Sequence, residues 1–190
     1  MLNYRDLLWL LTLRDIKIRY AQSVLGVGWA IVQPMFSMLV FTVIFGKLAK
    51  IGSDGVPYPL FCFSAMVAWS YFSNAVTEAT NSVVVNANML GKVYFPRLIL
   101  PLSAVLAKLL DLFIALVMLF ILMLIFRWPI HWTVLFSPIL VILMVLTAAG
   151  LGFWLTALVV QYRDVKYGLS LAMQLLLYAA PVVYPISMVP

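Results

Sequence analysis

Long apolar runs alternate with short polar segments along this chain, and the alternation predicts a bundle of membrane-spanning helices. Each apolar run is long enough to cross about 30 Å of hydrocarbon at about 1.5 Å per residue. We place five spans at residues 24–46, 58–78, 102–126, 134–160 and 168–186. The pattern therefore predicts an all-α fold, a polytopic membrane helix bundle that forms a single domain over residues 1–190.

The segment before the first span is dense in apolar residues but too short to cross a bilayer. Residues 3–22 combine leucines and Trp9 with charges at both ends. This composition is typical of an interfacial amphipathic helix, although a basic anchor that only fixes orientation explains it equally well. A cleavable signal peptide is excluded because charged residues follow at once and no small-residue cleavage site appears. We expect this segment to be retained.

The main polar interruption is residues 81–101, which separate the second and third spans. This segment contains three Asn, one Gly and two Pro, and Lys92 and Arg97 are its only charges. Such a stretch belongs in water or at an interface, because unpaired backbone groups are costly in hydrocarbon. We interpret it as a cytoplasmic loop that contacts a partner, with a second short cytoplasmic loop at residues 161–167.

Composition and charge fix the protein class and the orientation. The chain is 66% hydrophobic and 9% charged, whereas soluble domains carry about 25% charged residues. Its net charge of +6 comes from basic residues at the ends of apolar runs, which indicates membrane orientation rather than nucleic-acid binding. With the N-terminus inside, the cytoplasmic side holds Arg5, Arg14, Lys17, Arg19, Lys92, Arg97, Arg163 and Lys166, against Lys47, Lys50 and Arg127 outside.

Three charged residues fall near or within the predicted spans: Glu78, Lys108 and Asp111. All three lie toward the cytoplasmic face, and no ionisable residue lies near the midplane. Lys108 and Asp111 are three residues apart and can pair, and Glu78 can contact Lys108 across two helices. We therefore favour a gate-stabilising or snorkelling role over an ion pathway.

Catalytic and cofactor chemistry is sparse in this sequence. No segment matches the GxxxxGK[ST] pattern, so we expect no ATP binding through a P-loop of the chain's own. His131 is the only histidine and Cys62 the only cysteine, which leaves no catalytic triad and no metal site. Glu78 with Asp111 is the best carboxylate pair that an enzyme could use, and it is a poor one.

Segments spread over most of the chain resemble one family. They are residues 14–29 (RDIKIRYAQSVLGVGW), the Gln-Pro pair at 33–34, residues 92–101 (KVYFPRLILP), residues 162–165 (YRDV) and residues 178–190, which contain APVVYPISMVP. Together they resemble the permease subunits of type-2 ABC exporters, above all the bacterial polysaccharide exporters of the O-antigen type.

The resemblance implies a permease that dimerises in the bacterial inner membrane, with its N-terminus cytoplasmic. ATP and Mg would bind a separate P-loop ATPase subunit, and the substrate would be a glycan on an undecaprenyl-type lipid. A coupling helix maps onto about residues 81–96, and an amphipathic helix that also touches the ATPase maps onto about residues 4–20. The candidate ATPase-coupling residues are Arg14, Lys17, Arg19, Asn86, Asn88, Lys92, Arg97, Arg163 and Asp164. Family members have a sixth span, so we expect the chain to be truncated at its C-terminus.

Aromatic residues in or beside the second span could offer stacking faces to a glycan, although packing and interface belts are the commoner role of such residues. These candidate channel residues are Tyr58, Phe61, Trp69, Tyr71 and Phe72. Two alternatives stay open: an exporter of the same architecture that moves teichoic acid, a lipid or a drug, and a membrane-embedded enzyme of lipid-linked glycan assembly.

Overall fold

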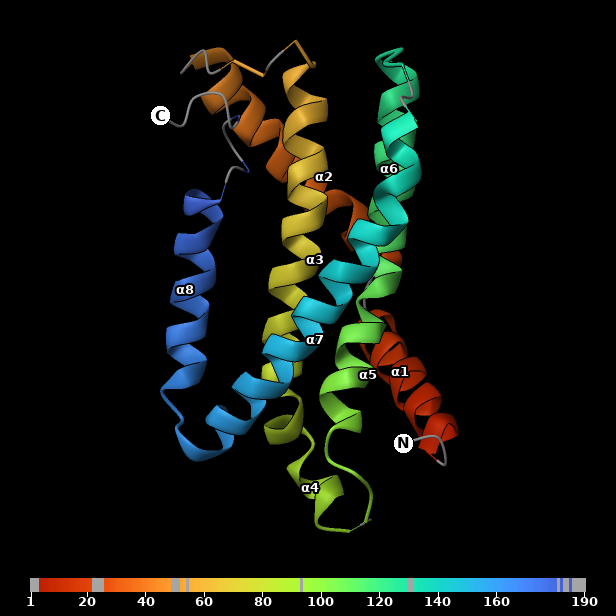
Figure 1. The fold of residues 1–190 in the computed structure, drawn as a ribbon, viewed down its shortest axis with the longest axis vertical. Helices are drawn as coiled ribbons and strands as arrows, with labels where there is room; N and C mark the ends of the chain where they lie inside the picture. Colours follow the sequence, from red (N-terminus) through yellow and green to blue (C-terminus); the bar gives the residue numbers. More distant parts are fainter. Residues whose placement is uncertain are drawn as a thin grey trace.

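The structure is a computed structural model, and it describes residues 4–21, 26–48, 52–53, 55–92, 94–129, 132–180, 182 and 185, without the side chains of Val27 and Thr133. Within this part of the chain the regular structure is helical and includes no strand (Figure 1). The prediction of an all-α membrane helix bundle is therefore confirmed.

The chain begins with α1, Arg5–Tyr20, and a short 3-10 turn, Gly26–Gly28, leads into the bundle. The longer helices that follow are α2 (Trp29–Phe41, continued by a π-helical segment, Thr42–Leu48), α3 (Tyr58–Val85), α6 (Leu109–Ile125), α7 (Ser137–Gln161, preceded by the 3-10 turn Trp132–Phe136) and α8 (Val165–Ala179). The shorter α4 (Ala87–Leu90) and α5 (Ile99–Ala107) connect α3 to α6. Prolines near the starts of α3 and α7 suit the first helical turn, where no backbone donor is needed.

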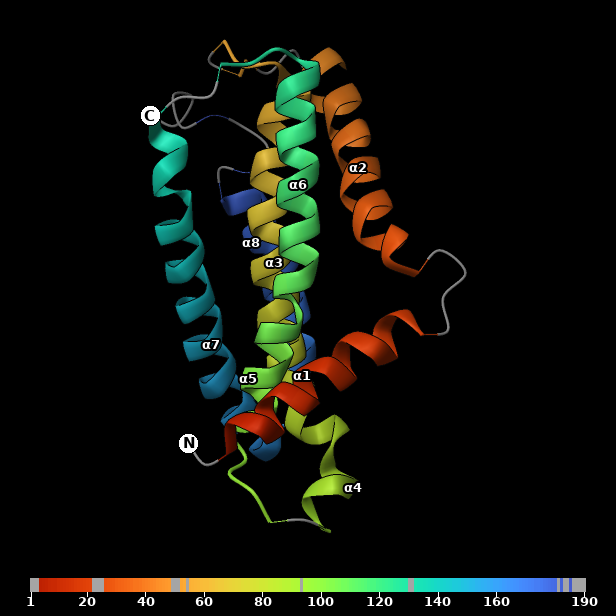
Figure 2. The same cartoon turned by 90° about the vertical axis from the view of Figure 1, so that its right-hand side faces the viewer.

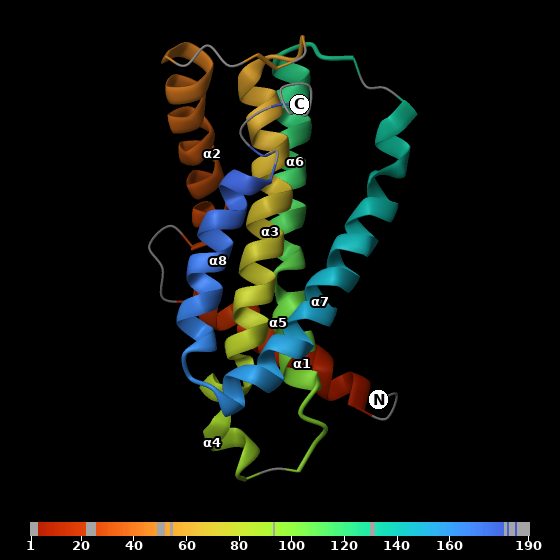
Figure 3. The same cartoon turned by 60° about the vertical axis from the view of Figure 1, so that its left-hand side comes forward.

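Helix α3 is the centre of the bundle. It packs against α2, α5, α6, α7 and α8, and the three ribbon views show it between these neighbours (Figures 1, 2 and 3). Helix α1 runs obliquely across the bundle, beside α5 (Figure 2). It is held there by Leu11, which packs with Phe95, Ile99 and Leu100. The N-terminal helix is thus part of the fold rather than a free surface anchor.

Four helices are long and apolar enough to cross a membrane in the described part of the chain: Trp29–Leu48, Tyr58–Val85, Ile99–Ile125 and Val134–Gln161. They match the first four predicted spans. The fifth differs, because α8 has 15 residues, which cover roughly 22 Å of the about 30 Å core. Most of the predicted fifth span beyond Ala179, including the proline-rich end at 181–190, lies outside the described residues.

The predicted central loop, residues 81–101, is too long at both ends, because α3 continues to Val85 and α5 begins at Ile99. The polar side chains after Glu78 find hydrogen-bond partners within the helix itself. Asn81 donates to the carbonyl of Thr77, and Ser82 donates to that of Ala79. The connection between α3 and α5 is therefore residues 86–98, which include α4.

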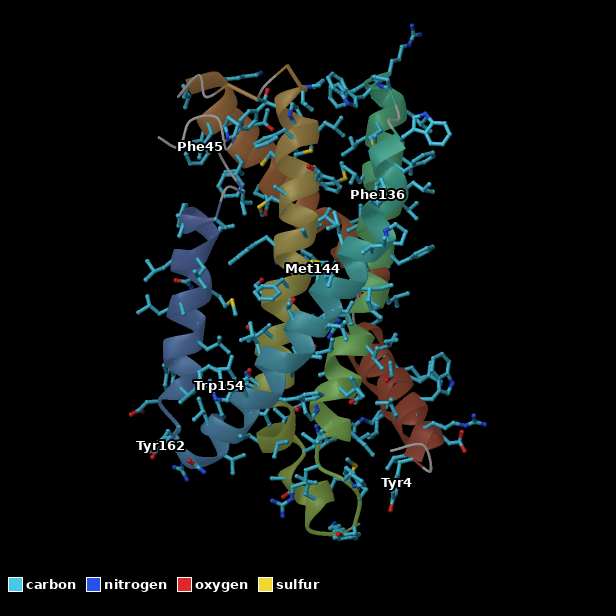
Figure 4. All side chains as sticks on the ribbon, viewed as in Figure 1. Tyr4, Phe45, Phe136, Met144, Trp154 and Tyr162 are labelled. Atoms are coloured by element: carbon cyan, nitrogen blue, oxygen red, sulfur yellow. The ribbon has the colours of Figure 1, made fainter. Side chains whose placement is uncertain are left out.

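The second predicted loop, residues 161–167, is also shorter than expected, because α8 already begins at Val165. Residues 162–164 alone make the turn. This turn lies at the same end of the bundle as the α4 connection (Figures 1 and 3). Tyr4 and Tyr162 mark this end, whereas Phe45 lies toward the other (Figure 4). Each end of the bundle thus carries the segments that the charge pattern assigned to one side of the membrane.

Candidate functional site

The predicted membrane-edge charges meet in the structure and recruit a fourth residue. The Lys108 ammonium lies 2.7 Å from Glu78 Oε1 and 3.6 Å from Asp111 Oδ2, so both predicted contacts are confirmed. Arg19 of α1 pairs with Asp111 at 2.7 Å through Nη1 and with Glu78 through Nη2. Arg19, Glu78, Lys108 and Asp111 form a closed ring of alternating charge, which we call the charge ring.

The charge ring joins three parts of the fold, because its residues come from α1, α3 and the junction of α5 with α6. Lys108 is the residue between α5 and α6, and it is buried, with 7% of the residue exposed. Charges in so poorly hydrated a place need partners, and two cations with two carboxylates leave no net charge. The charge ring therefore links the orientation of α1 to the membrane helices.

Tyr20 adds a hydrogen bond to this arrangement, because its hydroxyl donates to Asp111 Oδ1. Burial, together with the hydrogen bond and negative charge of Asp111, raises the pKa of Tyr20 to about 12. The phenol is therefore a neutral donor at physiological pH. The Tyr20 hydroxyl thus binds one oxygen of the Asp111 carboxylate, and Arg19 binds the other.

A second polar link ties α1 to the α4 connection. The Arg14 guanidinium donates to Asp15 at 2.8 Å and to Asn86 Oδ1 at 3.0 Å. Asp15 in turn accepts a hydrogen bond from Ser103 of α5 at 3.2 Å. This contact is thus a polar link between the start of the α4 connection and α1.

The candidate coupling residues divide into two sets. Arg14, Arg19 and Asn86 are partly buried and bonded within the chain, as described above. The other six are exposed: Lys17, Asn88, Lys92, Arg97, Arg163 and Asp164. Of these, the residues from the α4 connection and the α7–α8 turn belong to segments that lie at one end of the bundle (Figures 1 and 3). Tyr94, 95% exposed, belongs to the same surface.

The candidate channel aromatics also divide. Tyr58 and Tyr71 are buried, and the Tyr71 hydroxyl donates to the carbonyl of Val105. Phe61, Trp69 and Phe72 are half-buried. Trp69 and Phe72 line an apolar hollow of about 310 Å³, together with Ala65, Ala68, Met144 and Val182. Within one chain these two rings border an open hollow, whereas the two tyrosines are packed inside the bundle.

Sequence reasoning missed the contacts of Tyr20, Asp15 and Ser103, and it predicted that Arg19 contacts the ATPase rather than the membrane-edge charges. The spacing of polar residues along α1 does not show how a helix that lies across a bundle is oriented, or which of its side chains face the bundle. In the folded chain α1 packs on α5 through Leu11, and Arg19 lies beside Glu78 and Asp111. One signal in the sequence could have indicated the role of Arg19. Glu78 and Asp111 outnumber Lys108 among the charged residues of the predicted spans, so a further cation is needed to balance them.

Metal-ligating groups do not gather in the described residues, where no three His, Cys, Asp or Glu side chains come close enough to hold an ion. The two carboxylates of the charge ring are already neutralised by Arg19 and Lys108.

Comparison with known proteins adds independent findings. Residues 6–190 match the family model of the ABC-2 type transporter. The chain is 31% identical over 187 residues, 97% of its length, to an O-antigen export system permease protein of Myxococcus xanthus, covering 70% of that protein. It is 29% identical over the same share of its length to an O-antigen export system permease protein of Klebsiella pneumoniae, covering 71% of it. A polysialic acid transport protein of Escherichia coli is 25% identical over 62% of this chain and 44% of its own length.

Proposed function

The chain belongs to the ABC-2 type transporter family, and on that basis we propose that it is the membrane-spanning permease of an ATP-driven exporter of lipid-linked polysaccharide. It is a multi-pass transport subunit rather than an enzyme, and ABC transporters of this family pair such a subunit with an ATPase. The family therefore excludes the alternative of a membrane-embedded enzyme of glycan assembly. The proposed substrate follows the relatives named for O-antigen and polysialic acid transport.

The observation that carries the proposal is the exposed surface at one end of the bundle, made by the α4 connection and the α7–α8 turn. We call this surface the docking end; it comprises Asn88, Lys92, Tyr94, Arg97, Arg163 and Asp164. The Arg14–Asn86 contact ties the docking end to α1, and the charge ring ties α1 to α3 and α6. A push from an ATPase at the docking end thus has a polar path into the membrane helices.

The finer assignments belong to the same proposal. Two copies of the permease form the transport path, each with its own ATPase subunit, and ATP with Mg binds that partner. The complex lies in the bacterial cytoplasmic membrane with the N-terminus and the docking end in the cytoplasm, as the distribution of Lys and Arg favours. The glycan is carried on an undecaprenyl-type lipid.

Affinity purification of the full-length protein in mild detergent tests this function. We expect a P-loop ATPase to co-purify in stoichiometric amount and to hydrolyse ATP. Cross-links from cysteines introduced at Lys92 and Arg97 should reach that ATPase, whereas a cysteine at Arg127, at the opposite end, should not. A permease that purifies without an ATPase, in cells that express every neighbouring gene, contradicts the proposal.

A further inference from the structure

Two polar hollows border the charge ring. One has a volume of about 440 Å³; we call it the end hollow, and its lining includes Arg14, Arg19, Glu78, Asn81 and Asn86. The other has a volume of about 310 Å³; we call it the span hollow, and its lining includes Arg19, Tyr20, Gln33, Asn74, Lys108 and Asp111. Arg19 thus lines both hollows, and the rest of the charge ring is divided between them.

The order of residues along α3 shows that the charge ring lies between the two hollows. Asn74 lines the span hollow and Asn81 lines the end hollow, and Glu78 is about one helical turn from each of them. Because α3 leads into the α4 connection, Asn81 is the one nearer the docking end. At the level of Glu78, ion pairs reach Lys108 at 2.7 Å and the guanidinium of Arg19. Paired side chains therefore occupy the level that separates the hollows.

The end hollow makes the ion pairs of Arg19 reversible. A buried ion pair is normally held closed, because its separated charges would lie in a medium that solvates them poorly. Here the side chains of Arg19 and Glu78 are 23% and 41% exposed, and both border the end hollow. That hollow has room for several water molecules, which can hydrate the separated charges. Arg19 can therefore leave its two carboxylates, while Lys108 still bridges Glu78 and Asp111.

From the proposed function above, on which this inference rests, we propose that the charge ring is a gate operated by α1. In the closed state, which the structure shows, Arg19 binds Glu78 and Asp111 and separates the span hollow from the docking end. When the ATPase moves α1 through the Arg14–Asn86 contact, Arg19 is withdrawn from the ring. The two hollows then join into one water-filled passage that reaches the level of Asn74.

The reactivity of a cysteine beyond the gate tests this inference with the charge ring intact. Asn74→Cys is placed in the full-length complex with its ATPase, in inside-out membrane vesicles, and a charged, membrane-impermeant methanethiosulfonate is added to the cytoplasmic face. We expect slow modification without nucleotide and a rate about tenfold higher or more after trapping with ATP and vanadate. Asn81→Cys, in the end hollow, should react at a similar rate in both states. The chain without an introduced cysteine, in which Cys62 is buried, gives the background rate.

A charge-neutral double variant tests the charge ring itself. Arg19→Gln with Glu78→Gln removes the ion pairs that hold α1 to the ring and should make Asn74→Cys reactive without nucleotide. Arg19→Lys keeps a cation at this position and should give an intermediate rate. The matched control is Arg5→Gln with Asp6→Asn, which removes an ion pair of the same helix whose side chains are 83% and 93% exposed. It should leave the rate at Asn74→Cys unchanged.

The outcomes separate the gate from the proposed function. A rate at Asn74→Cys that is equal in both nucleotide states overturns the gate, and so does a double variant that reacts as slowly as its control. If the rate follows the nucleotide state but the wild-type complex moves no lipid-linked glycan, polysaccharide export fails while the gate stands. If glycan is moved and the rate stays constant, the gate alone fails.

Discussion

Lys108 shows, at the scale of one residue, how a charge is kept inside a membrane protein. Its ammonium lies between Glu78 and Asp111, and 7% of the residue is exposed. Breaking a buried pair by removing one partner costs more than the pair contributes, because the remaining charge is left without compensation. The neutral balance of the charge ring thus matters more than any single contact within it.

Lys108→Met should lower the free energy of unfolding by about 2–3 kcal/mol, because it leaves two carboxylates facing Arg19 alone. The double variant Lys108→Met with Glu78→Gln restores neutrality and should recover part of the loss. Unfolding in mixed micelles, followed by tryptophan fluorescence, measures both. Lys92→Met, at an exposed position, is the control and should change stability by less than about 0.5 kcal/mol. Equal stability of the two lysine variants would contradict the role of the charge ring.

The raised pKa of Tyr20 predicts that the stability of the protein changes with pH in the alkaline range. Its pKa is raised from 10.0 to about 12, so its contribution to stability is complete below pH 10 and is lost as the pH rises through 12. We expect the difference in unfolding free energy between wild type and Tyr20→Phe to be constant from pH 6 to 9 and to shrink above pH 10. Parallel stability curves up to pH 11 would show that the hydroxyl does not bond Asp111.

The sequence predicted much of the candidate site at this scale. The spacing of Lys108 and Asp111 and the depth of Glu78 were enough to predict their contacts. Arg19 and Tyr20 were not placed beside these residues, because their contacts depend on the direction of α1 relative to α3 and α6. That direction is set by packing between distant segments, which periodicity along one segment does not record.

The contact of α3 with α7 shows, at the scale of the element, how glycine sets the distance between helices. A Cβ built on Gly152 would lie 2.7 Å from the Cβ of Ala79, whereas one built on Gly150 meets nothing within 4 Å. Thr156, one turn later, donates to the carbonyl of Ala79 at 2.9 Å. Of these two glycines, Gly152 is therefore the one at which the helices approach closely.

Gly152→Ala should therefore destabilise the protein by about 1–3 kcal/mol through overpacking. Gly150→Ala, which differs only in its helix face, should be neutral or slightly stabilising. Thermal unfolding of the purified variants in detergent measures the difference, and Ala79→Gly in the Gly152→Ala background should restore stability. Two alanine variants of equal stability would contradict the packing of α3 on α7.

Element boundaries were the least predictable part of the fold. Polarity after Glu78 suggested a loop, but α3 continues to Val85, and Asn81 and Ser82 bond to carbonyls of the same helix. Pro101 suggested an end to the loop, yet it lies in the first turn of α5, where a proline costs no hydrogen bond. Composition thus predicted which segments leave the membrane better than it predicted where the helices stop.

The separation of charges between the two ends is the main feature at the scale of the whole molecule. The docking end carries Lys92, Arg97 and Arg163, while Arg127 lies in the turn after α6 at the other end (Figure 2). An exposed basic surface favours an acidic partner and speeds its association. The same distribution orients the chain in the membrane.

Arg97→Ala and Lys92→Ala should each weaken binding of the ATPase about twofold to fivefold, the range expected for an exposed charge pair. Titration of the purified ATPase against permease in nanodiscs measures this, and raising the salt concentration should reduce the difference. Arg127→Ala should leave the affinity unchanged. Affinities that fall equally in all three variants would place the ATPase contact elsewhere.

The most direct test of the whole account is ATP-dependent movement of a lipid-linked glycan in proteoliposomes that contain the full-length permease and its co-purified ATPase. We predict that glycan becomes accessible to a lectin on the far side of the membrane when ATP and Mg are supplied to the docking end. It should stay inaccessible with a non-hydrolysable analogue. ATP hydrolysis without any such movement, for lipid-linked glycans isolated from the source cells, would contradict polysaccharide export.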